Sequence, residues 1–380
     1  MKKTVPFQTM ILVIWALIMC ASTAFTLTSP KETVSPYYDT MKEAALLAQR
    51  AMQAVRQYKV DHGIPISEED ILDTGMLGDR YTSITTTVGV LEAKRTTFNP
   101  NWAAVIVNMF AEAGLKEGDQ VGMVFSGSFP ALNICAMAAA QTFGVDVCIM
   151  ASVGASSYGA NNVDFTFFDM AEYLFTQGIL TNRIRYMSYG GADDVGLEFA
   201  DEDKENILQR IENSGIEFIE EKDFHKNVRM RIDLFEKHLP NMKFFLNVGG
   251  SLVGMGSGLS AFSQSGYVKP GHIDVTGSSI PGVGLSKDFG LLEYYHASGI
   301  PVANLLNIKG IALEYGIEYD PVVMPPVGEG KTYYSVTYNL TIPYVTLVIF
   351  AGIMTFYCIH ARKNSIEVNK NERNYILCGR

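Results

Sequence analysis

The sequence predicts an α/β protein. We expect a mainly parallel sheet covered by helices in an extracytoplasmic domain, flanked by N- and C-terminal transmembrane helices. Three observations lead to this fold class. Short apolar runs typical of buried strands alternate with helical runs between about residues 120 and 315. Polar, glycine-containing loops follow most strand-like runs, as in parallel sheets with helices on both faces. An uncharged apolar segment lies near each end of the chain.

The two uncharged segments are residues 7–27 and 341–359. Each is long enough to cross the roughly 30 Å of bilayer hydrocarbon as a helix. A cleaved signal peptide is the alternative interpretation of the first segment, with Lys2 and Lys3 as its basic start. Residues 22–24 form a poor cleavage site, which favours an uncleaved anchor.

Basic residues lie on the terminal side of both segments, and this bias predicts that residues 1–6 and 360–380 are cytoplasmic. Residues 28–340 then form the outer domain of a plasma (inner) membrane protein. The whole chain carries a net charge of −10, the N-terminal tail +2 and the C-terminal tail +3, which leaves −15 for the outer domain. Such a field repels nucleic acid, so we expect no nucleic-acid partner and a locally built site for any anion.

Local composition predicts the elements of the outer domain. Residues 36–58 are rich in Ala, Leu, Met and Gln and indicate a long helix, either a stalk or the first core helix. Residues 67–70 resemble a capping box before a short helix, and residues 82–91 are β-prone. An Asn-Pro pair opens a helix over residues 99–113. The alternating pattern then predicts strands 121–125, 145–150, 183–187, 243–248 and 301–306, and helices 131–143, 202–213, 224–238, 287–298 and 308–315.

Each polar loop follows the carboxyl end of a predicted strand. Because the carboxyl ends of parallel strands meet at one edge of a sheet, we expect these loops to line one ligand pocket. Backbone amides and small hydroxyls dominate them, which suits an anion such as a carboxylate. The predicted ligand contacts are Ser126, Gly127, Ser128, Ser152, Gly154, Ser156, Asn161, Gly249, Gly250, Ser251 and Asn307.

The turn Ser126-Gly127-Ser128 allows three interpretations. A nucleophile elbow needs small residues two positions to either side of the serine, and Val124 and Pro130 fit this need poorly. An anion cradle would use the free amides at the start of the following helix. A plain connection with a capping serine is the third interpretation.

Two further stretches bear on ligand binding. Lys94 and Arg95 are the basic pair nearest the predicted pocket. An Arg fork suits a carboxylate, and a solvated surface pair is the alternative. Residues 249–258 are as rich in glycine as a phosphate loop but lack the GK[ST] motif and the GxGxxG fingerprint. We therefore expect no cofactor.

No metal site is predicted. Three carboxylates and one imidazole could ligate a divalent ion or do acid–base work, but their spacing matches no established pattern. Asp193 and Asp194 alternatively cap a loop. The four groups belong to Asp193, Asp194, His272 and Asp274. The five cysteines contain no CxxC pair. Cys135 and Cys148 in the outer domain are either buried small residues or a disulfide.

Several stretches of the outer domain resemble the poly-γ-glutamate system protein family. They are ITTTVGVLEAKRTTFNPNWAA, GDQVGMVFSGSFPALNI, ASVGASSYGANNVDFTFFDM, FFLNVGGS and GIPVANLLNI, in matching order along most of the domain. Members are membrane proteins associated with the ligase and membrane subunits that make and export poly-γ-glutamate. The resemblance implies a role in the synthesis or export of this anionic polymer, with those subunits as partners. It assigns no catalytic residues.

These observations favour a membrane-anchored accessory protein of poly-γ-glutamate synthesis or export, whose strand-end pocket holds a γ-glutamyl carboxylate. One alternative is a serine-dependent hydrolase or transferase of γ-glutamyl amide bonds. Its nucleophile and base would be drawn from Ser126, Ser128, His272 and His296. A third possibility is a structural protein that only clamps the subunits of the synthase complex.

Overall fold

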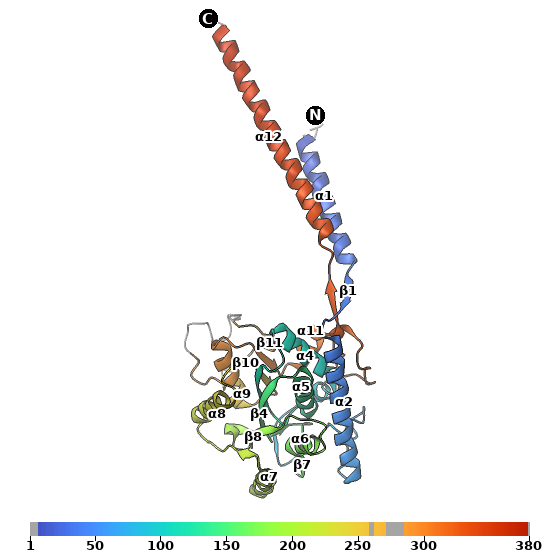
Figure 1. Ribbon diagram of the computed structural model, residues 1–380, viewed down its shortest axis with the longest axis vertical. Coiled ribbons are helices and arrows are strands. Elements are labelled where there is room, and N and C mark those ends of the chain that lie inside the picture. The colour runs from blue at the N-terminus through green and yellow to red at the C-terminus, as the bar shows by residue number, and fades with distance from the viewer. Residues whose placement is uncertain (1–6, 258–261, 271–284, 379–380) are drawn as a thin grey trace. The chain divides into compact units, whose positions relative to one another are not determined.

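The computed structural model describes residues 7–257, 262–270 and 285–378. The chain divides into two compact units, which are coloured by residue number in Figure 1. The terminal unit consists of both chain ends, Met1–Val34 and Tyr334–Arg380. The sheet unit is Ser35–Tyr333.

The terminal unit pairs the two ends of the chain. Helix α1 (Phe7–Thr28) leads into strand β1 (Lys31–Val34), and strand β13 (Tyr334–Thr337) leads into helix α12 (Thr341–Cys378). The strands β1 and β13 form an antiparallel ribbon. Helix α1 therefore runs towards the ribbon and α12 runs away from it. The two helices are antiparallel and lie side by side (Figure 1).

Within the described residues, one segment is long and apolar enough to cross a membrane, Thr341–Ile359 of α12. The described apolar part of α1, Leu12–Thr28, is shorter, so a span in α1 stays a prediction. The two helices touch, because the ring centroids of Trp15 and Phe350 are 6.0 Å apart. Helix α12 continues to Cys378, through most of the predicted cytoplasmic tail.

The sheet unit is built on seven strands. They are β3 (Gln120–Phe125), β4 (Asp146–Ser152), β8 (Ile184–Ser188), β9 (Glu217–Phe218), β10 (Met242–Val248), β11 (Gly266–Val268) and β12 (Val302–Leu305). Their order across the sheet is β11-β12-β10-β3-β4-β8-β9. Every neighbouring pair is parallel except β11 and β12. The predicted mainly parallel sheet is therefore confirmed.

Alternate residues of the central strands pack on opposite faces of the sheet. In β10, Phe244 and Leu246 belong to one hydrophobic core and Phe245 to a second. In β4, Ile149 and Met150 divide in the same way. Because side chains alternate along a strand, the two cores lie on the two faces, and the architecture has three layers.

Helices cover both faces. The first core contains α2 (Tyr38–Asp61), α4 (Trp102–Glu112) and α5 (Pro130–Phe143), which pack on one another, so the predicted first helix belongs to the core. The second core contains α8 (Phe224–His238) and α10 (Leu291–Ala297). The shorter elements are β2 (Thr85–Thr87), α3 (Leu91–Thr96), β5 (Ala155–Ser156), β6 (Asn161–Asn162), β7 (Phe165–Thr166), α6 (Phe167–Thr176), η1 (Ala192–Asp194), α7 (Asp201–Ser214), α9 (Leu252–Met255), α11 (Ile308–Tyr315) and η3 (Lys331–Tyr333).

One local prediction was wrong, and a second was confirmed only in part. Residues 67–70 form no helix. The Asp70 carboxylate instead accepts the backbone N–H of Gly75 at 2.8 Å, which closes a turn. Residues 82–91 contain only the three-residue strand β2 before α3 begins at Leu91, and β2 pairs with β5 in a separate two-stranded sheet.

The two cysteines of the sheet unit are buried and free. Cys135 belongs to the first core and Cys148 to the second, so the sheet separates their thiols and no disulfide joins them. Burial raises the pKa of the Cys148 thiol to about 12. Both residues therefore act as small core side chains.

Candidate functional site

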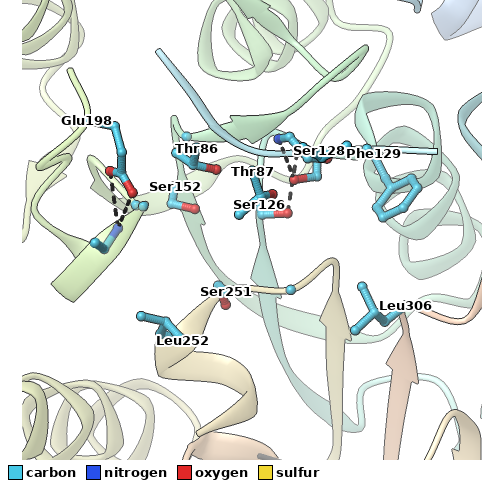
Figure 2. A pocket seen from close by; sticks show the side chains of 18 of the residues that line it. Thr86, Thr87, Ser126, Ser128, Phe129, Ser152, Glu198, Ser251, Leu252 and Leu306 are labelled. Atoms are coloured by element: carbon cyan, nitrogen blue, oxygen red, sulfur yellow. Dashed lines mark hydrogen bonds between the residues drawn. The ribbon is translucent and has the colours of Figure 1, made fainter. Parts of the chain in front are cut away.

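The strand-end loops surround a pocket of about 450 Å³. It lies at the carboxyl edge of the sheet, as expected for an open α/β fold. Figure 2 shows Ser126, Ser152 and Ser251, which lie at or just beyond the ends of β3, β4 and β10, around one space, with Thr86 above them. The lining residues named in advance from the sequence are Lys94, Ser126, Ser128, Ser152, Gly154, Ser156, Asp194, Gly250 and Ser251.

Backbone hydrogen bonds hold these loops together beyond the strand ends. The N–H of Ser126 donates to the carbonyl of Val248 at 3.1 Å. The N–H of Gly127 donates to the carbonyl of Gly154 at 3.1 Å, and that of Gly154 to the carbonyl of Tyr189 at 2.7 Å. These bonds extend the ladder of the sheet, so each loop is placed by its neighbour.

Two glycines permit this close approach. A Cβ on Gly127 would lie 2.4 Å from the Val153 carbonyl oxygen, and a Cβ on Gly249 would lie 2.1 Å from Ser126 Oγ. Gly249 also has φ of +90°, which side chains other than glycine rarely adopt. Both were predicted as ligand contacts, but neither lines the pocket. They hold the loops in place.

A small second sheet forms another wall of the pocket. Strand β2 pairs in parallel with β5, and the N–H of Ser157 donates to the Thr87 carbonyl at 2.9 Å. This pairing brings the end of β2 and the chain that follows it over the serine loops. The lining residues from this wall are Thr86, Thr87, Val88, Gly89 and Val90.

Lys94 is the basic residue of the lining, and only 2% of it is exposed. Its Nζ donates to Ser156 Oγ at 2.7 Å and to the Ser128 carbonyl, and it lies 4.0 Å from the centroid of the Phe129 ring. All three partners are uncharged. Burial lowers the pKa of the Lys94 ammonium to about 7. Among the described residues, no carboxylate lies within ion-pair distance of it.

Two acidic side chains also line the pocket, and each has its own partner. Asp194 is buried and pairs with the buried Arg231 at 2.5 Å. It also accepts hydrogen bonds from Ser188 Oγ and Asn227 Nδ2. Glu198 accepts the Ala192 N–H at 3.0 Å, as Figure 2 shows. Lys94 is thus the buried charged group of the lining without a charged partner, whereas Glu198 is exposed and is held by a backbone amide.

The metal candidates do not assemble in the described part of the chain. Asp194 is neutralised by Arg231, and no group of three or more His, Cys, Asp or Glu side chains there could hold an ion. His272 and Asp274 lie outside the described residues. Asp193 is exposed, with φ of 52° in a tight turn.

Three predicted contacts are engaged elsewhere. Arg95 forms a two-bond ion pair with Asp320, with both N–O distances 2.6 Å, so its fork is occupied. Asn161 is fully buried and accepts the Asp79 N–H at 2.9 Å, which fastens two loops. Asn307 caps α11, accepting the N–H of the third residue of that helix. None of the three lines the pocket.

The serine–histidine alternative is not assembled by the described residues. His296 lies in the last turn of α10, which leads into the start of β12. A helix that precedes a parallel strand ends at the opposite edge of the sheet from the strand's carboxyl end. The ring Nε2 of His296 lies 3.2 Å from the Lys269 carbonyl, away from the pocket lining. It cannot be the base for Ser126 or Ser128.

Several lining residues were not identified from the sequence. They are Thr86, Thr87, Val88, Gly89, Val90, Ala93, Phe129, Glu198, Leu252 and Leu306. The β-prone character of residues 82–91 was visible, but only the pairing of β2 with β5 brings this stretch to the site. Its position depends on a contact between residues about 70 positions apart, which composition does not encode.

Comparisons with known proteins add little. No protein-family model and no curated protein matches the chain. Among solved structures, an archaeal alanine:glyoxylate aminotransferase matches at 10% identity and a TM-score of 0.14, over 54% of this chain and 48% of that chain. The chain thus spans about half the length of that enzyme. A likeness this low carries no conclusion about fold or function.

Proposed function

We propose that this chain is a membrane-anchored accessory protein of poly-γ-glutamate synthesis or export, and that its pocket binds a γ-glutamyl carboxylate. The resemblance described above supports the pathway. The apolar segment of α12 supports attachment to a membrane. We further propose that α1 forms a second span, that both termini are cytoplasmic and that the sheet unit is extracytoplasmic. The ligase and membrane subunits of the synthase are the proposed partners.

One observation carries the ligand class: Lys94 is a buried amine, cationic below about pH 7, that contacts only neutral oxygen atoms and an aromatic face. A charge buried without a counter-charge is unfavourable, and a carboxylate in the pocket would supply that counter-charge. The surrounding hydroxyls of Ser126 and Ser128, which only accept hydrogen bonds within the pocket, can donate further hydrogen bonds to the same anion.

Isothermal titration calorimetry on the full chain in nanodiscs, with a γ-linked tetraglutamate as probe, tests this proposal. A charge-assisted hydrogen bond contributes about 1.5–3 kcal/mol, so Lys94→Met should weaken binding roughly 10- to 150-fold. Lys222→Met removes an exposed lysine and serves as the matched control. Equal affinity in the Lys94→Met and wild-type proteins would refute the ligand class.

The affinity should also depend on pH. The carboxylate binds the ammonium form of Lys94, which becomes the minor form as pH rises above about 7. Binding must then take up a proton, and affinity should fall up to tenfold per pH unit. The other charged groups of the lining, Asp194 and Glu198, are engaged by Arg231 and the Ala192 amide. A tetrapeptide with amidated α-carboxylates should bind without this pH dependence.

A further inference from the structure

We infer that Ser156 and Lys94 form a nucleophile–base pair, and that the pocket carries out acyl transfer on a γ-glutamyl amide. The inference rests on the proposed function for its substrate class only. Its starting observation is geometric: Lys94 Nζ lies 2.7 Å from Ser156 Oγ, within the distance that general-base catalysis requires. Serine–lysine pairs are one of the convergent forms of the serine nucleophile and its base.

Lys94 is suited to accept a proton. A base must be available in its neutral form near the working pH, and an ordinary lysine is not. Burial of Lys94 among uncharged partners supplies this property, because desolvation lowers its pKa to about 7. Glu198 and Asp194, the acidic groups of the same lining, are held by Ala192 and Arg231. Neither forms an ion pair with Lys94.

Ser156 is held rigidly and faces the pocket. It belongs to β5, and its N–H donates to Ser128 Oγ at 3.0 Å. Gly89 packs against Ser156. A Cβ on Gly89 would lie 3.2 Å from Ser156 Oγ and 2.3 Å from the Ser157 carbonyl oxygen. The absent side chain leaves space beside the hydroxyl. By contrast, the hydroxyl of Ser126 accepts the N–H of Ser128, and no described side-chain base contacts it.

The pocket also offers stabilisation for an oxyanion. Ser128 Oγ accepts the Ser156 N–H, so its own hydroxyl proton remains free to donate to a substrate oxygen. Helix α5 starts two residues after Ser128 and has no side-chain cap, so its positive end lies beside the same turn. A volume of about 450 Å³ accommodates a γ-glutamyl unit.

The reaction follows from these positions. Neutral Lys94 Nζ takes the hydroxyl proton of Ser156 as Oγ bonds to the γ-carbonyl carbon. The C–N bond then breaks, and the leaving amine takes the proton from the Lys94 ammonium. The resulting ester is attacked by water, giving hydrolysis, or by the amine of a second γ-glutamyl chain, giving transfer. In either case Lys94 takes the proton of the attacking group and returns it to Ser156 Oγ.

Labelling with a fluorophosphonate tests the pair directly. The full chain in detergent is treated with the probe and the adduct is located by peptide mass spectrometry. We expect an adduct on Ser156 whose rate of formation rises with pH through about 7. Loss of a general base typically costs 10²–10⁴-fold, so Lys94→Met should label at least about 100-fold more slowly. The controls Lys222→Met and Ser298→Ala change exposed residues far from the lining and should label as wild type.

Lys94→Arg separates the two roles of the lysine. An arginine keeps the positive charge but cannot lose a proton, so it preserves carboxylate binding and abolishes labelling. Ser156→Ala must abolish labelling and keep calorimetric binding of the tetraglutamate, which also shows that the variant is folded. No adduct at Ser156 in a wild-type protein that binds the probe peptide would refute acyl transfer alone. An adduct without peptide binding would refute the proposed ligand class alone.

Discussion

The chemistry of Lys94 follows from its surroundings rather than from its residue type. Its ammonium has lost its water shell and gained two neutral oxygen acceptors and an aromatic face. In the unfolded chain the same side chain is hydrated and has an ordinary pKa of about 10.4. Folding therefore releases a proton wherever the pH lies between the two pKa values. Burying this group destabilises the folded state fully below the lower pKa, and the cost falls as pH rises towards the upper one.

We predict that Lys94→Met stabilises the protein in a pH-dependent manner. In wild type, the buried Lys94 ammonium lowers the free energy of unfolding by its full amount below about pH 7. Between about pH 7 and pH 10 this loss decreases by about 1.4 kcal/mol per pH unit. The difference between variant and wild type should therefore shrink as pH rises from 7 to 9. Urea unfolding followed by fluorescence of the buried Trp102 measures it. Parallel pH profiles for the two proteins would contradict the prediction, and Lys222→Met should match wild type.

For single residues, the sequence predicted that a basic side chain lies at the pocket, but it did not show which of two neighbours this is. Lys94 and Arg95 were both expected at the ligand, yet adjacent residues on a helix point about 100° apart. One reaches the pocket and the other reaches Asp320. No local pattern in LEAKRTT distinguishes the two, because the direction of α3 is set by long-range packing.

At the scale of elements, the alternation of strands and helices was predictable because buried parallel strands are continuous apolar runs. Helices α8 and α11 match their predicted bounds. Helix α6 was missed, although Thr166 and Asp169 form a capping box that the letters TFFD contain. Strand β2 lies within the stretch predicted as β-prone, but β5 and its pairing with β2 were beyond prediction, since a two-residue element carries little pattern.

A buried ion pair fastens the turn η1 to helix α8. Asp194 and Arg231 are 4% and 1% exposed in their side chains. Removing one partner leaves the other charge buried, so Arg231→Met should lower the free energy of unfolding by about 3–5 kcal/mol. The solvent-accessible pair Arg56 and Asp73 provides the control, because water screens this pair and Arg56→Met should destabilise the protein much less than Arg231→Met.

Thermal and urea unfolding of the full chain in detergent measures both variants. A loss below about 1 kcal/mol for Arg231→Met would show that the pair does not hold the turn in place. The double variant Arg231→Met with Asp194→Asn should recover part of the loss, since it no longer buries an unpaired charge.

At the scale of the whole molecule, the ribbon of β1 and β13 bears on topology. The ribbon pairs the chain segment that enters the sheet unit with the segment that leaves it. The end of α1 and the start of α12 are therefore held close together. If both helices span a bilayer, the two termini must emerge on the same side. Reporter fusions at residue 200 and after Arg380 should therefore report opposite sides, with the C-terminal reporter cytoplasmic. The same side for both fusions would contradict the two-span arrangement.

The ribbon also determines how the molecule responds to tension. Force applied through the two helices acts on the end of the ribbon where Lys31 faces Thr337. Its hydrogen bonds are then loaded one pair at a time, as in a zipper, and not all together. While these pairs hold, the ribbon joins the two chain segments next to residues 35 and 333 and opposes their separation. The four residue pairs of the ribbon would therefore break before a force that separates the terminal helices could act on the chain of the sheet unit.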